Sequence, residues 1–150
     1  MDEGAFWQLI EECRPAAPDP DGVGLAAGLI GVLVAGPLYA VIGFAEQLSW
    51  ALYRLDRWQF GLQPKGRELS GDQFLYTRAA VVAAGRAEYE RVLTDSSRFA
   101  PYAAAPVSAE SLLYVPDESY ERITGEEWDR RTRYDYESYS NAKGWVGAPT

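Results

Sequence analysis

Hydrophobic residues recur along most of the chain at the spacing of an α-helix. Near the start, Phe6, Leu9, Ile10 and Cys13 stand at positions i, i+3, i+4 and i+7, which places them on one face of a helix. Asp2 can cap this helix, and a proline follows its end. The pattern therefore predicts an amphipathic first helix with Cys13 facing the core.

Residues 22–45 contain no charged side chain, and a run of this length can span a bilayer. Gly36 and Pro37 interrupt it, and proline is favoured at the first position of a new helix. We favour two short helices packed as a buried hairpin, with a membrane span as the alternative. The second helix is expected to continue past Trp58 and to end at Gly61. So many small and aliphatic residues also predict a homodimer formed through this hairpin.

A capping box marks the next helix. The Ser70 hydroxyl can accept from the third amide of a helix while the Gln73 side chain reaches back. Arg78 then lies on or beside the apolar face. Gly85 loosens this helix, which is expected to end at 94–97.

The segment 99–107, rich in proline and alanine, is expected to be a surface connection. A last helix is predicted from Ser108 to Gly125, with Pro116 kinking or dividing it. The chain is thus predicted to be all-α, a single compact bundle of about five or six helices with a less ordered C-terminal tail.

The sequence changes character after residue 125, where charged residues, tyrosine and glycine replace aliphatic ones. We therefore divide the chain into a helical domain, residues 1–125, and an acidic, Tyr-rich tail, residues 126–150. The tail is either mobile or wrapped around the domain by its aromatic residues, or it is an arm that orders when it binds a partner. The candidate partner-binding residues of such an arm are Trp128, Tyr134, Tyr136 and Trp145.

Composition narrows the chemistry. The 150 residues include no histidine, which removes the usual general base and the commonest zinc ligand. The single cysteine permits no internal disulfide and favours a cytoplasmic protein. The net charge of −8 argues against nucleic acid and favours a protein partner of basic character. We expect no cofactor, and no catalytic residue can be named.

Two acidic stretches invite a metal interpretation. Asp19 and Asp21 lie in a proline-rich linker that lacks the further ligands of a calcium loop. Glu126, Glu127 and Asp129 follow no ligand spacing and are interpreted as solvated charge. The sequence therefore predicts no metal site.

Four residues could form a small ligand site, namely Asp56, Trp58, Asp72 and Arg78. A carboxylate and a guanidinium on neighbouring helices, beside an aromatic wall, could hold a small polar molecule. The other interpretation is structural. Arg78 would pair with Asp56 or Asp72 and tie two helices together, because an arginine on an apolar face needs a partner. We favour the ion pair.

Five short motifs occur at characteristic places along the chain. They are Phe6-Trp7, Tyr53-Arg54-Leu55-Asp56-Arg57-Trp58, Ser70-Gly71-Asp72-Gln73-Phe74, Glu110-Ser111-Leu112-Leu113-Tyr114 and Tyr120-Glu121-Arg122-Ile123-Thr124-Gly125. Together they resemble the bacterial family of unknown function DUF4240, over residues 1–125. The resemblance implies a small, mainly helical, cytoplasmic domain and assigns no activity, so no catalytic residue follows from it.

Two classes of function follow. The first is an accessory or protein-interaction module, favoured by the acidic composition, the missing histidine and the aromatic tail. The alternative is a small histidine-independent enzyme or small-molecule-binding protein, whose Asp/Arg/Trp pocket would rely on carboxylates or tyrosines for proton transfer.

Overall fold

The protein is all-helical in a computed structural model that describes residues 1–63, 69–105 and 107–149. These residues form nine α-helices and two short 3₁₀-helices, and no β-strand occurs among them. In chain order the elements are α1 (Glu3–Cys13), α2 (Val23–Ala35), α3 (Leu38–Arg54), α4 (Trp58–Gly61), α5 (Gly71–Ala83), α6 (Arg86–Thr94), η1 (Ser96–Phe99), α7 (Ala100–Ala104), α8 (Glu110–Leu113), α9 (Val115–Thr124) and η2 (Ala142–Trp145).

The all-α class is confirmed, but the predicted five or six helices are too few because three of them are divided. The helix predicted to run past Trp58 ends instead at Arg54, and α4 is a separate turn. Gly85 has a φ of 98°, which no α-helix can contain, so α5 and α6 are distinct. Pro116 stands at the start of α9, where its fixed φ and missing N–H are tolerated.

The segment 99–107 was expected to be a surface connection, and that expectation is wrong for its first half. Residues Ala100–Ala104 form α7, and the side chains of Phe99 and Ala103 are buried. Ser108 does not cap the following helix, which begins after Ala109. Alanine-rich, proline-containing sequence therefore contributes a short helix to the core here.

The predicted helix starts at Asp2 and Ser70 are confirmed. The Asp2 carboxylate accepts from the Ala5 N–H at 2.7 Å. Ser70 and Gln73 form the reciprocal pair of a capping box, with distances of 3.1 and 3.0 Å. Each cap satisfies backbone donors that a helix start leaves without partners.

The uncharged run 22–45 is divided between α2 and α3, which meet at Gly36 and Pro37. Among the described residues, no helix is both long enough and apolar enough to cross a membrane. The outer side of this hairpin leaves Val23, Val32 and Tyr39 exposed. A homodimer through the hairpin stays a prediction.

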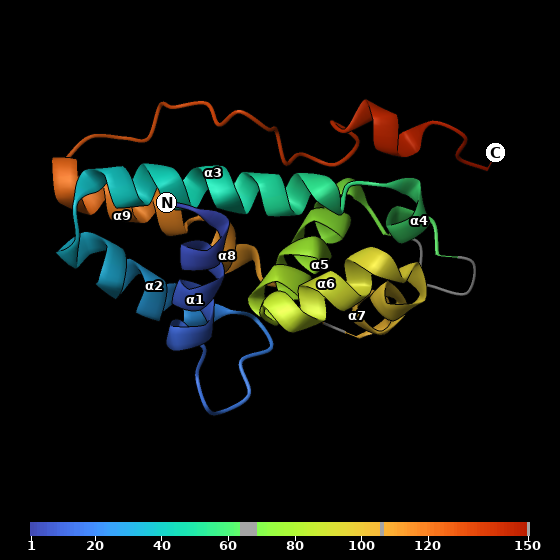
Figure 1. The fold of residues 1–150 in the computed structure, drawn as a ribbon, viewed down its shortest axis with the longest axis horizontal. Helices are drawn as coiled ribbons and strands as arrows, with labels where there is room; N and C mark the ends of the chain where they lie inside the picture. Colours follow the sequence, from blue (N-terminus) through green and yellow to red (C-terminus); the bar gives the residue numbers. More distant parts are fainter. Residues whose placement is uncertain (64–68, 106, 150) are drawn as a thin grey trace.

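Helix α3 runs along the length of the molecule, and the other helices pack below and beside it (Figure 1). Helix α9 packs against α2 and α3, while α5 contacts α3, α6 and α8. The core between them is aromatic and aliphatic, and its fully buried members include Phe6, Ile10, Leu29, Phe44, Leu48, Leu52, Phe74, Val82 and Phe99.

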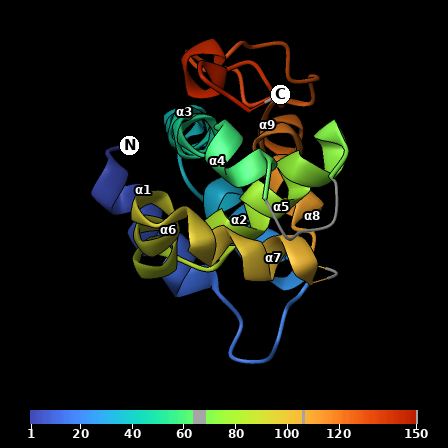
Figure 2. The ribbon, with the colours of Figure 1, turned by 90° about the vertical axis from the view of Figure 1, so that its right-hand side faces the viewer.

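Residues 126–149, which we call the strap, run along α3 on the side opposite α1 (Figure 1). The end-on view places the strap above both α3 and α9 (Figure 2). Exposure alternates along its middle: the even-numbered residues 132–138 are half-buried, and the odd-numbered residues 131–139 are exposed. This period of two is that of an extended chain lying on a surface.

Candidate functional site: a buried clasp and an open groove

Asp56 lies in the link between α3 and α4 and is completely buried. One carboxylate oxygen, Oδ1, accepts from the Tyr139 N–H and from the Trp145 indole N–H, both at 3.0 Å. The other, Oδ2, accepts from the Asn141 N–H at 2.9 Å. All three donors belong to the strap, so the strap supplies the hydrogen bonds that a buried carboxylate requires.

Arg78 on α5 is also completely buried. Its guanidinium donates to the Leu52 carbonyl at 2.9 Å, and to the Tyr136 carbonyl and the Ser138 hydroxyl at 3.0 Å each. The guanidinium carbon lies 4.6 Å from the ring centre of Phe74, within cation–π range. Burial lowers the pKa of Arg78 to about 10, so the group stays charged at neutral pH.

No direct ion pair ties Arg78 to Asp56 or Asp72 in the part of the chain that the structure describes. The expected pairing is therefore corrected: the strap brings its own donors to Asp56 and its own acceptors to Arg78. The charge of Asp56 still raises the pKa of Arg78, against the larger effect of burial. We call Asp56, Arg78 and the strap groups that they bind the clasp.

The four candidate ligand residues do not share one open pocket. Trp58 is half-buried at the start of α4, and Asp72 is exposed in the first turn of α5. A molecule in solution cannot reach Asp56 or Arg78 while the strap covers them. Ligand binding by these four residues stays a prediction that requires the strap to move.

The aromatic residues of the strap rest on rings of the domain. Tyr134 packs against Trp50 and Tyr53, with ring centres 4.6 and 4.9 Å away. Trp145 meets Phe74 edge-on at 6.1 Å. These contacts bury large apolar surfaces in favourable ring geometries, and they hold the strap in place. Partner binding through these residues stays a prediction.

An open groove, which we call the strap groove, lies between the strap, α3 and the start of α9. Its volume is about 620 Å³, within the range of protein ligand sites. The buried side chains of Leu48, Leu113 and Pro116 form its floor, and the half-buried Trp128 and Tyr136 of the strap supply aromatic surface. Trp128 is steadied by an edge-on contact with the ring of Tyr120 at 5.3 Å.

Charged side chains of both signs line the strap groove. They are Arg130, Arg131, Arg133, Asp117, Asp135 and Glu137. The pKa of the Tyr136 hydroxyl is raised by burial first and then by the negative charges of Asp117, Glu137 and Asp135. Burial also raises the pKa of Asp117. Among the described residues, no group of three or more His, Cys, Asp or Glu could hold a metal ion.

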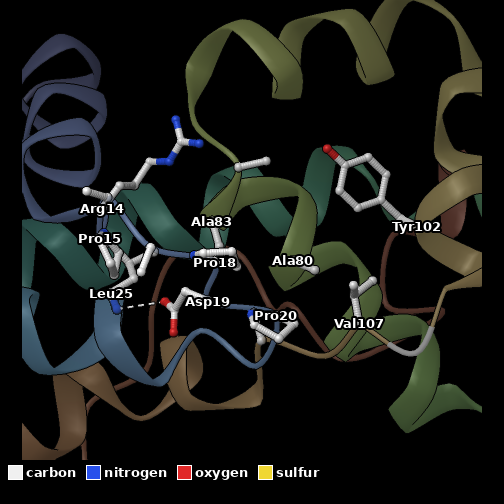
Figure 3. A pocket seen from close by; sticks show the side chains of 14 residues that line it. Arg14, Pro15, Pro18, Asp19, Pro20, Leu25, Ala80, Ala83, Tyr102 and Val107 are labelled. Carbon is white, nitrogen blue, oxygen red and sulfur yellow. Dashed lines mark hydrogen bonds between the residues drawn. The ribbon is translucent and has the colours of Figure 1, made fainter.

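A second cavity of about 390 Å³ lies between the proline-rich segment 15–20 and α5 (Figure 3). Prolines and alanines form most of its wall. The Asp19 carboxylate already accepts from the N–H groups of Gly24 and Leu25, both at 2.9 Å. The Tyr102 hydroxyl faces the cavity from the other side. Too few polar groups converge here to define a ligand.

The family comparison decides where the chain belongs. A model described as "Protein of unknown function (DUF4240)" matches residues 1–122. The chain belongs to the DUF4240 family. The match confirms the resemblance carried by the sequence motifs. No curated protein and no solved structure gives a significant match.

The strap lies beyond the matched part of this DUF4240 chain. Asp56 and Arg78 lie inside it, so two buried charges of the DUF4240 portion depend on residues outside that portion. The strap groove is likewise shared, with α3, α8 and α9 on one side and the strap on the other.

Sequence reasoning about this DUF4240 chain missed several residues of the clasp and the groove. Ser138 and Asn141 bind in the clasp, and Asp117, Arg130 and Arg131 line the groove. One signal could have indicated them. Between residues 131 and 138, charged residues alternate with tyrosine, threonine or serine, which is typical of an extended segment with one face against a surface.

Proposed function

We propose that this protein is a non-catalytic interaction module that binds an extended segment of a partner protein in the strap groove. The observation that carries the proposal is the groove itself, which is open, about 620 Å³ in volume and walled by aromatic and arginine side chains. Trp, Tyr and Arg are the residue types enriched in protein interfaces and in their energetic centres.

The surface of the groove suits a peptide. Trp128 and Tyr136 are half-buried and offer aromatic area to a side chain of the partner, and the buried side chains of Leu48, Leu113 and Pro116 form a rigid floor beneath them. The strap holds these rings in position through the clasp, so little ordering is left to be done when a partner binds.

The alternative is a small-molecule pocket, catalytic or not, formed by Asp56, Trp58, Asp72 and Arg78. It requires the strap to leave, which gives up the five strap hydrogen bonds of the clasp and the burial of the strap rings. The strap groove is accessible without that cost. We also place this module in the bacterial cytoplasm, in keeping with its single cysteine and its family resemblance.

The test begins with peptides selected from a random linear library on the immobilised full-length protein. Binding of the selected peptides is then mapped by NMR on the ¹⁵N-labelled full-length protein. We expect shifts at the amides of Leu48, Leu113 and Asp117 and at the indole of Trp128, with dissociation constants in the micromolar range.

Two tryptophan variants make the test specific. Trp128→Ala removes an aromatic wall of the groove and should weaken binding, while Trp58→Ala, outside the groove, should leave it unchanged. Loss of binding in the Trp58 variant alone would favour the Asp/Arg/Trp pocket. Shifts confined to other helices would overturn the proposal.

A further inference from the structure

The charges along the strap are sorted by sign. Residues 130–133 contribute three guanidinium groups to the strap groove, and residues 135–137 contribute two carboxylates. Arg131, Arg133, Asp135 and Glu137 are all exposed at a spacing of two. The exposed charges therefore change sign along the strap, from positive at Arg131 and Arg133 to negative at Asp135 and Glu137.

A second element strengthens the negative end. Asp117, at the start of α9, lines the groove together with Asp135 and Glu137. All three carboxylates also raise the pKa of the Tyr136 hydroxyl, after the larger effect of burial. The negative end is therefore built from both walls of the groove.

The charges that line the groove are not paired with one another, although the Asp135 carboxylate accepts from the Glu137 N–H at 2.9 Å and the Arg133 guanidinium lies 5.4 Å from the ring centre of Tyr134. Among the described residues, Arg130, Arg131, Arg133, Asp117, Asp135 and Glu137 form no ion pair within 4.0 Å. The ion pairs that do occur lie elsewhere, for example between Arg86 and Glu90 on α6. These six charges, all lining the strap groove, are therefore not neutralised by ion pairs among the described residues and can meet a ligand.

We infer that the partner segment is zwitterionic: about six residues long, apolar in the middle, with acidic side chains at the arginine end and basic side chains at the carboxylate end. The length matches the run of strap residues that lines the groove between Arg131 and Glu137. The apolar middle faces the half-buried rings of Trp128 and Tyr136. This inference rests on the proposed function and deepens it.

The inference replaces the expected partner of basic character with a segment that carries charges of both signs. The whole chain carries a net charge of −8, but the charges that line the strap groove are balanced in sign. Charge complementarity contributes more to the specificity of binding than to its affinity. The groove should therefore discriminate against segments of a single sign.

The experiment uses four blocked nine-residue peptides with the common centre Ala-Leu-Pro-Leu-Ala. One peptide has Asp-Asp at one end and Lys-Lys at the other. The other three have the same pair at both ends, which is Asp-Asp, Lys-Lys or Ser-Ser. Binding to the full-length protein is measured by NMR titration at low salt. The mixed peptide should bind about tenfold more tightly than either single-sign peptide, since several exposed ion pairs of modest strength are gained or lost together. Added salt should reduce the difference.

Reciprocal charge reversals complete the test. The double variant R131E/R133E makes the groove acidic and should prefer the all-lysine peptide. The double variant D135K/E137K makes it basic and should prefer the all-aspartate peptide. R91E on α6, which contributes nothing to the groove, should leave the order of the four peptides unchanged. All these positions are exposed, so the fold should be retained.

The results separate the two proposals. If all four peptides shift the groove residues with equal affinity, the zwitterionic inference is wrong and the interaction module stands. If none of the four peptides and no peptide selected from the library shifts the groove residues, both are wrong. A switch of preference in both double variants is the result that the inference requires.

Discussion

At the scale of single residues, two buried charges join parts of the chain that are far apart in sequence. Asp56 and the indole of Trp145 are 89 positions apart, and Arg78 and the Ser138 hydroxyl are 60 apart. Leaving a buried charge without partners is far more costly than any gain from a single hydrogen bond. The strap must therefore lie at one position along α3 and α5, where its donors meet Asp56 and its acceptors meet Arg78. This position also determines which strap side chains line the groove.

Arg78→Met should destabilise the protein severely. Methionine fills much of the volume but takes away the donor to the Tyr136 carbonyl, one of the two donors to the Leu52 carbonyl, and the nearby positive charge from Asp56. We expect the free energy of unfolding to fall by about 3–5 kcal/mol, measured by urea denaturation. The matched control is Arg91→Met, at an exposed position, which should change it by less than about 0.5 kcal/mol. A loss equal to that of the control would contradict the role of the clasp.

Asp117 should make stability depend on pH. Burial raises the pKa of its carboxyl in the folded protein, so the folded state holds this proton more tightly than the unfolded state does. Its contribution to stability therefore falls as the pH rises from the ordinary aspartate pKa through the raised folded value. Asp117→Asn should gain stability relative to the wild type across that window and keep the gain at neutral pH.

Urea titrations of the Asp117 variant and the wild type at several pH values from 3.5 to 7 test this expectation. Asp129→Asn, at an exposed strap position, serves as the control and should follow the wild-type curve. The opposite trend, with the wild type gaining on the Asp117 variant as the pH rises, would show that the helix start stabilises the carboxylate more than burial penalises it.

At the scale of elements, the sequence predicted helices well where local chemistry decides and poorly where tertiary contacts decide. The caps at Asp2 and Ser70 and the break at Pro37 depend on neighbours within a few residues, and all three are confirmed. The end of α3 at Arg54 has a different cause. The chain must leave the helix there for Asp56 to meet the strap, and no local pattern reveals a partner 85 positions away.

The candidate site shows the same division. Arg78 was correctly placed on an apolar face, because periodicity is a local property. Its partners were not predicted, since they are backbone carbonyls of Leu52 and Tyr136 rather than a carboxylate. Every residue has the same backbone groups, so the sequence does not indicate which of them will bind Arg78 and Asp56 in the folded chain.

Two glycine-to-alanine substitutions should change stability in opposite directions, one through a steric clash and the other through higher helix propensity. A Cβ on Gly144 would lie 2.5 Å from the Asp56 carbonyl oxygen, which is backbone and cannot move aside. Gly144→Ala should therefore loosen the strap and raise the rate of proteolysis within it. On α2, a Cβ on Gly31 meets nothing within 4 Å, and Gly31→Ala should stabilise the protein by up to about 1 kcal/mol.

Thermal unfolding and limited proteolysis of both glycine variants test this contrast. Because the two changes add the same methyl group, a shift in opposite directions isolates the effect of the surroundings. Equal behaviour of the two variants would mean that the strap does not approach Asp56 as closely as the structure shows.

At the scale of the whole molecule, the strap makes the long helix α3 an interior element. Helices cover one side of α3, and the strap covers part of the other, where Trp50 and Tyr53 contact Tyr134 (Figure 1). Without the strap these rings would form an apolar patch on the surface, of the kind that promotes association. The strap thus covers α3 and also forms one wall of the strap groove.

Removing residues 126–150 should therefore weaken the whole domain. Water would reach Asp56 and Arg78 and replace part of their hydrogen bonding, so the larger loss comes from the aromatic surface buried by Tyr134, Tyr136 and Trp145. These side chains are half-buried, so each contributes less than the roughly 1.5–3 kcal/mol of a fully buried large side chain, but together they form an appreciable part of the roughly 5–15 kcal/mol that stabilises a typical domain. We expect a lower melting temperature, stronger binding of a hydrophobic dye and association at high concentration. Removing only residues 147–150, which follow the last clasp contact at Trp145, should change none of these. If a chain ending at residue 125 melts cooperatively at the same temperature as the full-length protein, the strap does not contribute to the stability of the domain.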